Sequence, residues 1–163
     1  MDAKIVLEKF TSPADRADFA RLAENETVMS MNMGRAFTPE ETEGYFSYLL
    51  DYTLGQENAG GYKLRLGAGG PLVGIGTLWV KEDGTELDYM LLPEYWSRGY
   101  GTQAALALLD LARKNPGVTQ VTGIVDPGNV RSKRVLEKAG FVFDRAIDVE
   151  EDGSRAEIYL RGL

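Results

Sequence analysis

The sequence predicts an α+β domain with a mixed, mostly antiparallel central sheet of about seven strands and four helices. Three observations lead to this prediction. Short segments of alternating apolar and polar residues follow one another between residues 62 and 92, which is typical of an antiparallel meander. Segments with helical spacing lie on both sides of that stretch. The 163 residues, 44% of them hydrophobic, suit a single domain spanning residues 1–163.

The first part of the chain predicts one strand, over residues 4–10, and then two helices. Ser12 can cap a helix that runs to about residue 25, and Pro13 suits its first turn. Thr38 begins a second helix, because Pro39 and two glutamates follow it as in a capping box. Aromatic and leucine side chains at helical spacing continue this helix to about residue 52.

The rest of the chain predicts six more strands and two more helices. Turn compositions at residues 67–71 and 81–84 separate the three strands of the meander, and Gly140 ends the last helix as a C-cap. Residues 150–153 form the turn of a closing hairpin. The strands are expected at 62–66, 72–80, 85–92, 118–125, 141–149 and 155–160, and the helices at 102–113 and 129–139.

Composition excludes several classes of function. The chain has 18 basic and 25 acidic residues, a net charge of −7, so we expect no nucleic-acid partner and a preference for cations. The N-terminal residues lack the apolar run of a signal peptide, and no apolar run approaches a membrane span. We therefore expect a cytoplasmic protein with no membrane partner.

The chain contains no cysteine and no histidine. This excludes disulfides, thiolate zinc sites, a cysteine nucleophile and a Ser-His-Asp triad, and we expect no metal. Any acid or base must be a carboxylate, hydroxyl, phenol, amine or water.

A glycine-bearing loop between a strand and an apolar helix is the strongest local signal. Glycines at 99 and 101 allow close approach of a ligand, the helix start offers free N–H groups, and Arg98 adds a charge. A pyrophosphate would suit such a site, although a plain connection is the alternative. Residues 99–104 also fit a dinucleotide fingerprint with Asp126 further on, but the preceding meander is unlike its repeated βαβ units.

The second signal is a basic helix in an otherwise acidic chain. Its cationic residues could meet phosphate groups. The alternative is a solvated helix face capped by Asn129. The residues concerned are Arg131, Lys133, Arg134 and Lys138.

Together these two segments resemble the GNAT acetyltransferases, and most closely the branch of ribosomal-protein N-terminal alanine acetyltransferases. Residues 86–109 are similar to the acetyl-CoA signature of that branch. The pattern Asn129-x-x-Ser132-x-x-x-Leu136-Glu137-Lys138-x-Gly140-Phe141 is similar to its second signature. The resemblance covers the strand order of nearly the whole chain.

The resemblance implies the GNAT fold, splayed at the strand before the glycine loop, with acetyl-CoA as cosubstrate. It implies that Asn129 contacts the pantetheine arm. The sequence departs from the family motif at Trp96, where relatives have an arginine or a glutamine. The implied cosubstrate-binding residues are Met90, Leu91 and Leu92 in the gap, Ser97, Arg98, Gly99, Tyr100, Gly101 and Thr102 at the pyrophosphate, and Asn129, Ser132 and Arg134 on the last helix.

The chemistry needs a neutral amine, although a lysine-like amine has a pKa of about 10.4. Glu86 and Asp88 are the candidate bases, since alternation puts them on one face of a strand. They could instead be solvated strand carboxylates. The usual tyrosine acid of the family is Leu136 here, and Ser132 matches a serine proposed as the acid, which could also only bind CoA. The nearby Tyr89 and Tyr100 are expected to be structural.

We therefore expect an N-acetyltransferase that moves the acetyl group directly to a primary amine, either a protein N-terminus or a small cationic amine. A CoA-binding regulatory module without catalysis and a dinucleotide-binding domain are the alternatives. A monomer or homodimer is expected. The methionine-rich segment 29–35 is predicted either to wall the acceptor pocket or to pack as a core loop.

Overall fold

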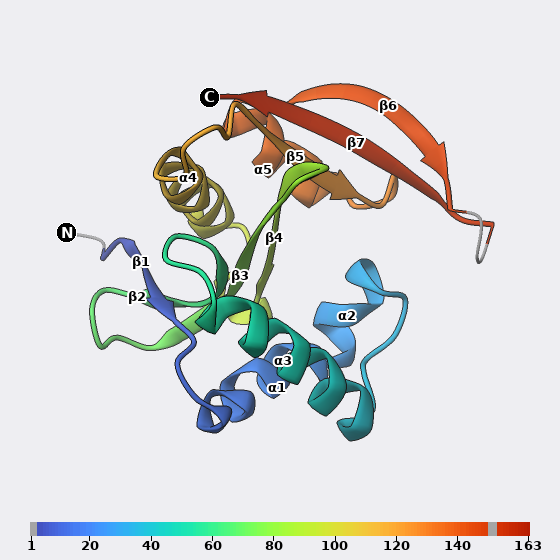
Figure 1. The fold of residues 1–163 in the computed structure, drawn as a ribbon. Helices are drawn as coiled ribbons and strands as arrows, with labels where there is room; N and C mark the ends of the chain where they lie inside the picture. Colours follow the sequence, from blue (N-terminus) through green and yellow to red (C-terminus); the bar gives the residue numbers. More distant parts are fainter. Residues whose placement is uncertain (1–2, 150–152) are drawn as a thin grey trace.

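The computed structural model describes residues 3–149 and 153–163. In these residues seven strands form one sheet in the order β1-β2-β3-β4-β5-β7-β6, with five helices around it (Figure 1). The strands are β1 Ile5–Lys9, β2 Gly60–Leu66, β3 Leu72–Lys81, β4 Gly84–Leu91, β5 Gln120–Val125, β6 Val142–Asp148 and β7 Arg155–Gly162. The helices are α1 Arg16–Ala23, α2 Glu26–Asn32, α3 Pro39–Leu54, α4 Tyr100–Arg113 and α5 Val130–Lys138, with 3-10 turns at Pro13–Asp15 and Pro93–Tyr95.

The sheet is antiparallel except between β4 and β5, which confirms the predicted mixed, mostly antiparallel α+β architecture. Strand β4 pairs with β3 along its whole length without a register shift. It pairs with β5 at a single position, Glu86 opposite Thr122. The two strands therefore diverge beyond Glu86, and the predicted splay before the glycine loop is present.

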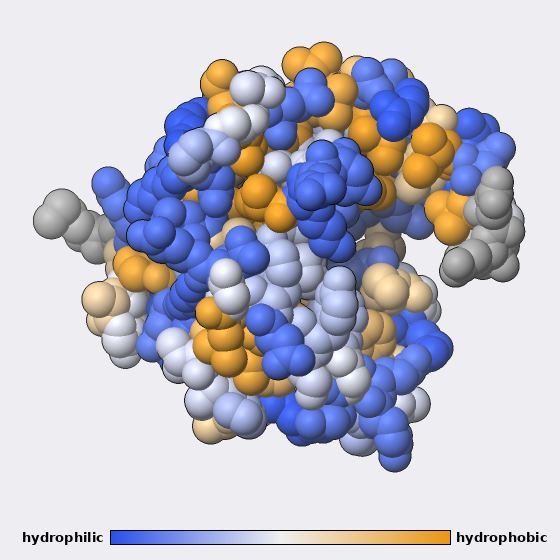
Figure 2. All heavy atoms as spheres, in the orientation of Figure 1, coloured by the Kyte–Doolittle hydropathy of each residue, from blue (hydrophilic) through white to orange (hydrophobic). Residues whose placement is uncertain are grey.

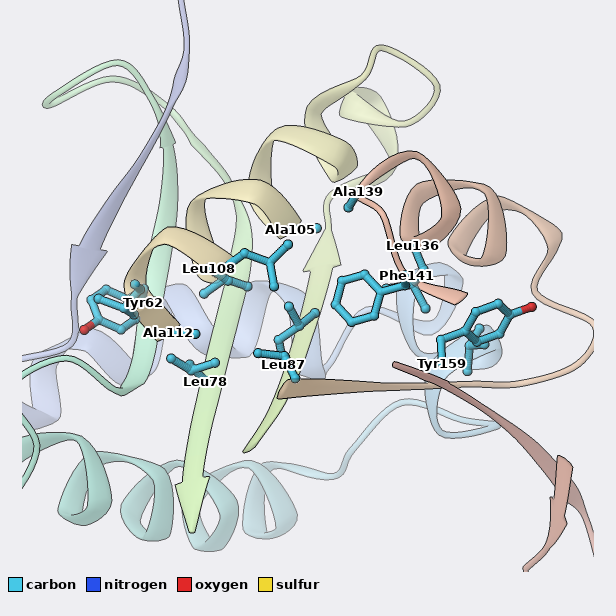
Figure 3. Close-up of a cluster of buried hydrophobic side chains, with 14 residues drawn as sticks. Tyr62, Leu78, Leu87, Ala105, Leu108, Ala112, Leu136, Ala139, Phe141 and Tyr159 are labelled. Atoms are coloured by element: carbon cyan, nitrogen blue, oxygen red, sulfur yellow. The ribbon is translucent and has the colours of Figure 1, made fainter. Parts of the chain in front are cut away.

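The two faces of β4 belong to different layers. Leu87, Tyr89 and Leu91 pack on the side of α4. The alternate positions, such as Met90, turn toward the layer of α1 and α3, because successive side chains of a strand point to opposite faces. Figure 3 shows the cluster between the sheet and the pair α4 and α5, in which Leu87 lies beside Leu108 and Phe141. Strand β4 therefore separates two groups of buried hydrophobic side chains, one on each face of the sheet.

Helix starts follow the expected capping chemistry. Ser12 and Thr38 both form capping boxes, with Asp15 and Glu41 as their partners. Asn129 caps α5 through its side chain. Gly140 follows α5 with a φ of +91°, a conformation that favours glycine. These local signals were readable in the sequence and are confirmed.

The described residues contain one α-helix more than predicted. The segment expected as a single helix from Ser12 to about residue 25 is a 3-10 turn followed by the shorter α1. Asn25 does not end a helix but begins α2, because its Oδ1 accepts a hydrogen bond from Val28 N at 3.1 Å. The other predicted boundaries lie within two residues of those observed.

The closing hairpin joins β6 to β7. Val149 N donates to Ser154 O at 2.7 Å, and Gly153 N donates to Val149 O at 3.0 Å. The remaining residues of the predicted turn, 150–152, lie outside the described residues. In Figure 1 this hairpin, at one edge of the sheet, curves beyond the other strands on the side of α2. Within the described residues, no helix is both long and apolar enough to cross a membrane.

Candidate active site

Two adjoining cavities lie where β4 and β5 diverge. The first, of 550 Å³, lies among β4, the glycine loop, α4 and α5. The second, of 380 Å³, lies on the side of α1, α2 and α3. The space-filling view is hollowed on the right, between the arch of β6 and β7 and the part that carries α2 (Figure 2). The two cavities share the lining residues Met31, Asn32, Tyr89, Met90, Asn129 and Ser132.

The larger cavity, here called the basic cavity, has a cationic lining. Arg131, Arg134 and Lys138 line it, and no Asp or Glu is among its described lining residues. Lys133, the fourth cation of the same helix, is turned away, because its Nζ lies 3.1 Å from Glu157 Oε1 on β7. Three of the four basic residues of α5 are therefore available to an anionic ligand.

The start of α4 adds an anion site to the basic cavity. Gly99 is the N-cap with φ +83°, and it offers no side-chain hydrogen bond to the first N–H groups. Gly101 sits where a Cβ would lie 3.0 Å from Val135 Cγ2, so glycine allows closer packing of α4 on α5 than a larger residue would. Free N–H groups and the positive end of the helix dipole favour a phosphate here.

Trp96 links the loop to the end of β4. Its Nε1 donates to Leu91 O at 2.9 Å, and the Arg131 guanidinium lies 4.2 Å from the centre of its ring. Trp96 therefore donates a hydrogen bond to a backbone carbonyl group at the end of β4, where β4 and β5 diverge. The face of its ring contacts the Arg131 cation. These two contacts give Trp96 a defined position in the site, where the family motif has an arginine or a glutamine.

Nine of the predicted cosubstrate residues line the basic cavity, and three do not. Leu92 is buried in the core with α1 and α3, Tyr100 packs edge-on against Tyr95, and Arg98 is exposed on the loop. Their contact with a cosubstrate stays a prediction. The nine are Met90, Leu91, Ser97, Gly99, Gly101, Thr102, Asn129, Ser132 and Arg134.

The smaller cavity, here called the acidic cavity, has the opposite charge. Glu86, Asp88 and Asp126 line it, and its described lining contains no Lys or Arg. Phe37 and Tyr45 add aromatic surface, with ring centres 5.8 Å apart. A cation would be stabilised there by both the carboxylates and the ring faces.

Burial perturbs the acids of this cavity. Desolvation and then the nearby Glu86 charge raise the pKa of Asp88 to about 7, against the opposing effect of the Thr77 and Trp79 side chains. Burial also raises the pKa of Glu86. Burial and the charges of Asp88 and Glu86 raise the pKa of Tyr45 to about 12. Asp88 can therefore exchange a proton near neutral pH.

The segment from Met29 to Arg35 contributes both to a cavity wall and to the core, and its contact with an acceptor stays a prediction. Met31 and Met33 are exposed residues that line the acidic cavity, whereas Met29 is buried at its base. Most of this segment belongs to α2, which the sequence reasoning missed. The signal for it was Asn25 followed by apolar residues at positions 28 and 29.

Two hydroxyl groups mark the junction of the cavities. Tyr89 Oη and Ser132 Oγ lie 3.1 Å apart, and both residues line both cavities. Asn129 fixes the position of Ser132 by accepting a hydrogen bond from its backbone N–H at 3.1 Å. The structure thus brings the predicted Ser132 together with a tyrosine that was expected to be structural.

Comparison with known families decides the class of the protein. Residues 4–142 match the acetyltransferase (GNAT) domain family. The chain belongs to the GNAT acetyltransferase family. The predicted fold, acetyltransferase class and acetyl-CoA cosubstrate are thereby confirmed, and the dinucleotide-binding alternative loses its support. Among the described residues, no group of three or more acidic side chains could hold a metal ion.

Several solved GNAT structures share the fold. An acetyltransferase (GNAT family) from Bacillus anthracis has a TM-score of 0.76 at 20% identity, over 100% of this chain and 96% of that chain. The aminoglycoside acetyltransferase AAC(6')-Ib in complex with coenzyme A and kanamycin has a TM-score of 0.78 at 20% identity, over 98% and 95%. Spermidine N-acetyltransferase from Vibrio cholerae in complex with CoA and spermine has 0.77 at 17%, also over 98% and 95%.

A relative with higher identity covers less of the chain. Over 62 residues the chain is 36% identical to the uncharacterized protein YkkB of Bacillus subtilis (strain 168). That match covers 38% of this chain and 36% of YkkB. The family therefore comes from the domain match, and the acceptor has to be argued from the site.

Proposed function

We propose that this GNAT domain moves the acetyl group of acetyl-CoA directly to a primary amine on a cationic acceptor. The observation that carries the proposal is the opposite charge of two cavities that share six lining residues. One cavity suits an anionic cosubstrate and the other a cationic acceptor. The two substrates would meet at the shared residues. Both cavities would belong to a single domain spanning residues 1–163.

Acetyl-CoA supplies an acetyl group on a thioester and carries several phosphates. The basic cavity provides Arg134 and Lys138 for phosphate charge, and the α4 N-terminus for a pyrophosphate. The gap between β4 and β5 would take the pantetheine arm, because beyond Glu86 the edge of β4 is no longer paired with β5. Apart from Leu91 O, which accepts from Trp96, backbone groups on that edge could bond to the arm. Met90 and Leu91 lie along that gap.

The acidic cavity would hold the acceptor. Its three carboxylates compensate an ammonium charge, and the rings of Phe37 and Tyr45 can contact the carbon chain or a second cation. Neither a carboxylate nor a phosphate acceptor would be stable beside Glu86 and Asp88. This supports a polyamine or aminoglycoside over an anionic or neutral acceptor.

Asp88 is the proposed base. The acceptor ammonium must lose a proton before its nitrogen can attack, and a base is most effective when its pKa lies near the working pH. The pKa of Asp88 is raised to about 7, so the ionised carboxylate is present above neutrality. Glu86 lies two residues earlier on the same face and would hold the ammonium by charge.

A protein N-terminus is the second candidate acceptor. The two signatures at residues 86–109 and 129–141 resemble the ribosomal-protein alanine acetyltransferases. An α-amino group has a pKa of about 7.7–8.0, so it loses its proton more readily than a side-chain amine. A flanking basic segment of such a protein would suit the acidic cavity.

An acceptor panel tests the proposal. CoA thiol release is measured with acetyl-CoA and spermine, kanamycin, a basic peptide with an N-terminal alanine, or a neutral amine such as glycinamide. The proposal expects turnover with at least one cationic amine and little with the neutral one. Binding of acetyl-CoA without turnover of any amine would instead support a CoA-binding regulatory module.

A further inference from the structure

Tyr89 lines both cavities, and it comes from β4 rather than from the helix that carries Ser132. Its ring rests against the first turn of α4, where Cε2 lies 3.6 Å from the position that a Cβ on Gly101 would occupy. Its hydroxyl lies 3.1 Å from Ser132 Oγ in the first turn of α5. The phenol therefore closes the space between the two helices at the junction of the cavities.

Consecutive residues of β4 reach this junction from opposite sides. Asp88 lines the acidic cavity, while Tyr89 turns to the face of α4 and α5. The same strand thus presents a carboxylate to the acceptor and a phenol to the cosubstrate. One residue could take a proton while its neighbour gives one.

The surroundings of Tyr89 suit a proton donor. Burial raises the pKa of the phenol, so it is protonated near neutral pH. The hydrogen bond with Ser132 and the Arg131 charge act in the other direction and stabilise the phenolate that forms after donation. Arg131 is held in turn by the Trp96 ring.

We propose that Tyr89 is the general acid that protonates the departing CoA thiolate, with Ser132 as its hydrogen-bonded partner. This inference rests on the proposed function. The position seven residues after Asn129, where the family resemblance places a tyrosine, holds the buried Leu136. Tyr89 supplies a phenol from a different element to the same meeting point.

Before the attack, the acceptor ammonium gives one proton to Asp88, which passes it to solvent. The amine nitrogen forms a bond to the acetyl carbon, and the carbon–sulfur bond breaks with its electron pair staying on sulfur. The sulfur takes the Tyr89 proton, and the second proton lost by the nitrogen goes to the ionised Asp88. Solvent then removes the proton from Asp88 and returns one to Tyr89 through Ser132.

Tyr89→Phe tests the assignment, because it removes the hydroxyl and keeps the ring against Gly101. We expect kcat to fall about 100-fold with the amine that the wild type acetylates fastest, while KM for acetyl-CoA is unchanged. Tyr95→Phe is the matched control. Tyr95 has the same ring beside the same loop and lines neither cavity, so kcat should stay at the wild-type value.

Ser132→Ala and the double variant separate a pair from a single acid. If the two hydroxyls act together, the double variant loses little more than Tyr89→Phe. A large loss in Ser132→Ala with wild-type kcat in Tyr89→Phe would overturn the assignment. An equal rise of KM and fall of kcat in Tyr89→Phe, with a lower melting temperature, would also overturn it in favour of a structural role.

A second readout does not depend on the acceptor. The slow hydrolysis of acetyl-CoA without amine also expels the thiolate, so Tyr89→Phe should slow it by a similar factor. Hydrolysis at the wild-type rate in this variant would contradict the role of Tyr89. Absence of amine acetylation by the wild type would contradict the proposed function instead, and the hydrolysis comparison would still decide on Tyr89.

Discussion

The basic and acidic cavities are neighbours that share six lining residues, yet their charges are opposite. The first is lined by Arg131, Arg134 and Lys138, and the second by Glu86, Asp88 and Asp126. The net charge of −7 does not indicate this separation, because it sums the charges of the whole chain, those of both cavities included. On the proposed function, this separation would sort the two substrates by charge before they meet at Tyr89 and Ser132.

The two cavities also differ in how they are built. The basic cavity depends on backbone features, namely the left-handed Gly99 and the close packing at Gly101. The acidic cavity depends on side chains that two layers bring together, with carboxylates from β4 and aromatic rings from α3 and the segment before it. Substitutions should therefore affect binding of one substrate without the other.

The largest effect is expected from Asp88→Asn. Removing the proposed base should lower kcat about 1,000-fold, while the affinity for acetyl-CoA, whose proposed site is the other cavity, should stay the same. A carboxylate accepts a proton only when ionised, and the pKa of Asp88 is about 7. The ratio of wild-type to variant kcat/KM should therefore rise with pH up to about 7 and then level off.

Steady-state kinetics between pH 5.5 and 9 check this prediction, with acetyl-CoA binding measured by titration calorimetry. Glu86→Gln is the matched control on the same face of β4. It should raise KM for the amine and keep a pH dependence that levels off at a lower pH, because the Glu86 charge helps to raise the pKa of Asp88. If Glu86→Gln instead removes the pH dependence and Asp88→Asn keeps it, Glu86 is the base.

Arg134→Glu tests the basic cavity. Losing a charge-assisted hydrogen bond to a phosphate costs about 1.5 kcal/mol, so the dissociation constant of acetyl-CoA should rise at least tenfold. The KM for the amine should not change. Arg113→Glu is the control, because Arg113 pairs with Asp110 at the far end of α4. Equal losses in both variants would mean that only overall charge matters.

Gly101→Ala tests the packing beneath the glycine loop. The added Cβ would lie 3.0 Å from Val135 Cγ2, so the Val135 side chain or its helix must shift by a few tenths of an ångström. We expect a loss of about 1 kcal/mol of unfolding free energy and weaker acetyl-CoA binding. Gly44→Ala is the matched control. Gly44 lies in α3 with no atom within 4 Å of its Cβ position, so alanine there should stabilise the protein. Urea denaturation of both variants measures the difference.

The smallest effect is expected from Asp126→Asn. Asp126 is exposed at the rim of the acidic cavity, and solvent screens its charge. The KM of the Asp126→Asn variant for a cationic amine should be about twice that of the wild type at low salt, and this difference should vanish at high salt. A larger, salt-independent effect would mean that Asp126 contacts the acceptor directly. Initial rates at 20 mM and 500 mM NaCl distinguish the two cases.

Local chemistry explains why much of the fold could be predicted. Capping residues such as Thr38 and Asn129, and the C-cap Gly140, act over one turn and are visible in the sequence. Alternation along β4 correctly placed Glu86 and Asp88 together. The miss was α2, where Asn25 was read as the end of one helix although its side chain caps the next.

The site was less predictable because its decisive contacts join distant segments. Nothing local to Lys133 indicates that it pairs with Glu157 rather than facing a ligand. The contact of Arg131 with Trp96 and that of Ser132 with Tyr89 likewise depend on how α5 packs against β4. The motifs identified the segments, but only the packing separates the residues that line a cavity from their neighbours.

The most direct test of charge sorting is a competition between acceptors at saturating acetyl-CoA. Equimolar spermine, glycinamide and aspartate are incubated with the enzyme, and the acetylated products are quantified by mass spectrometry. Acetylspermine should dominate the products, and Asp88→Asn should abolish its formation. Equal acetylation of the neutral or anionic amine would contradict the claim that the acidic cavity selects a cationic acceptor.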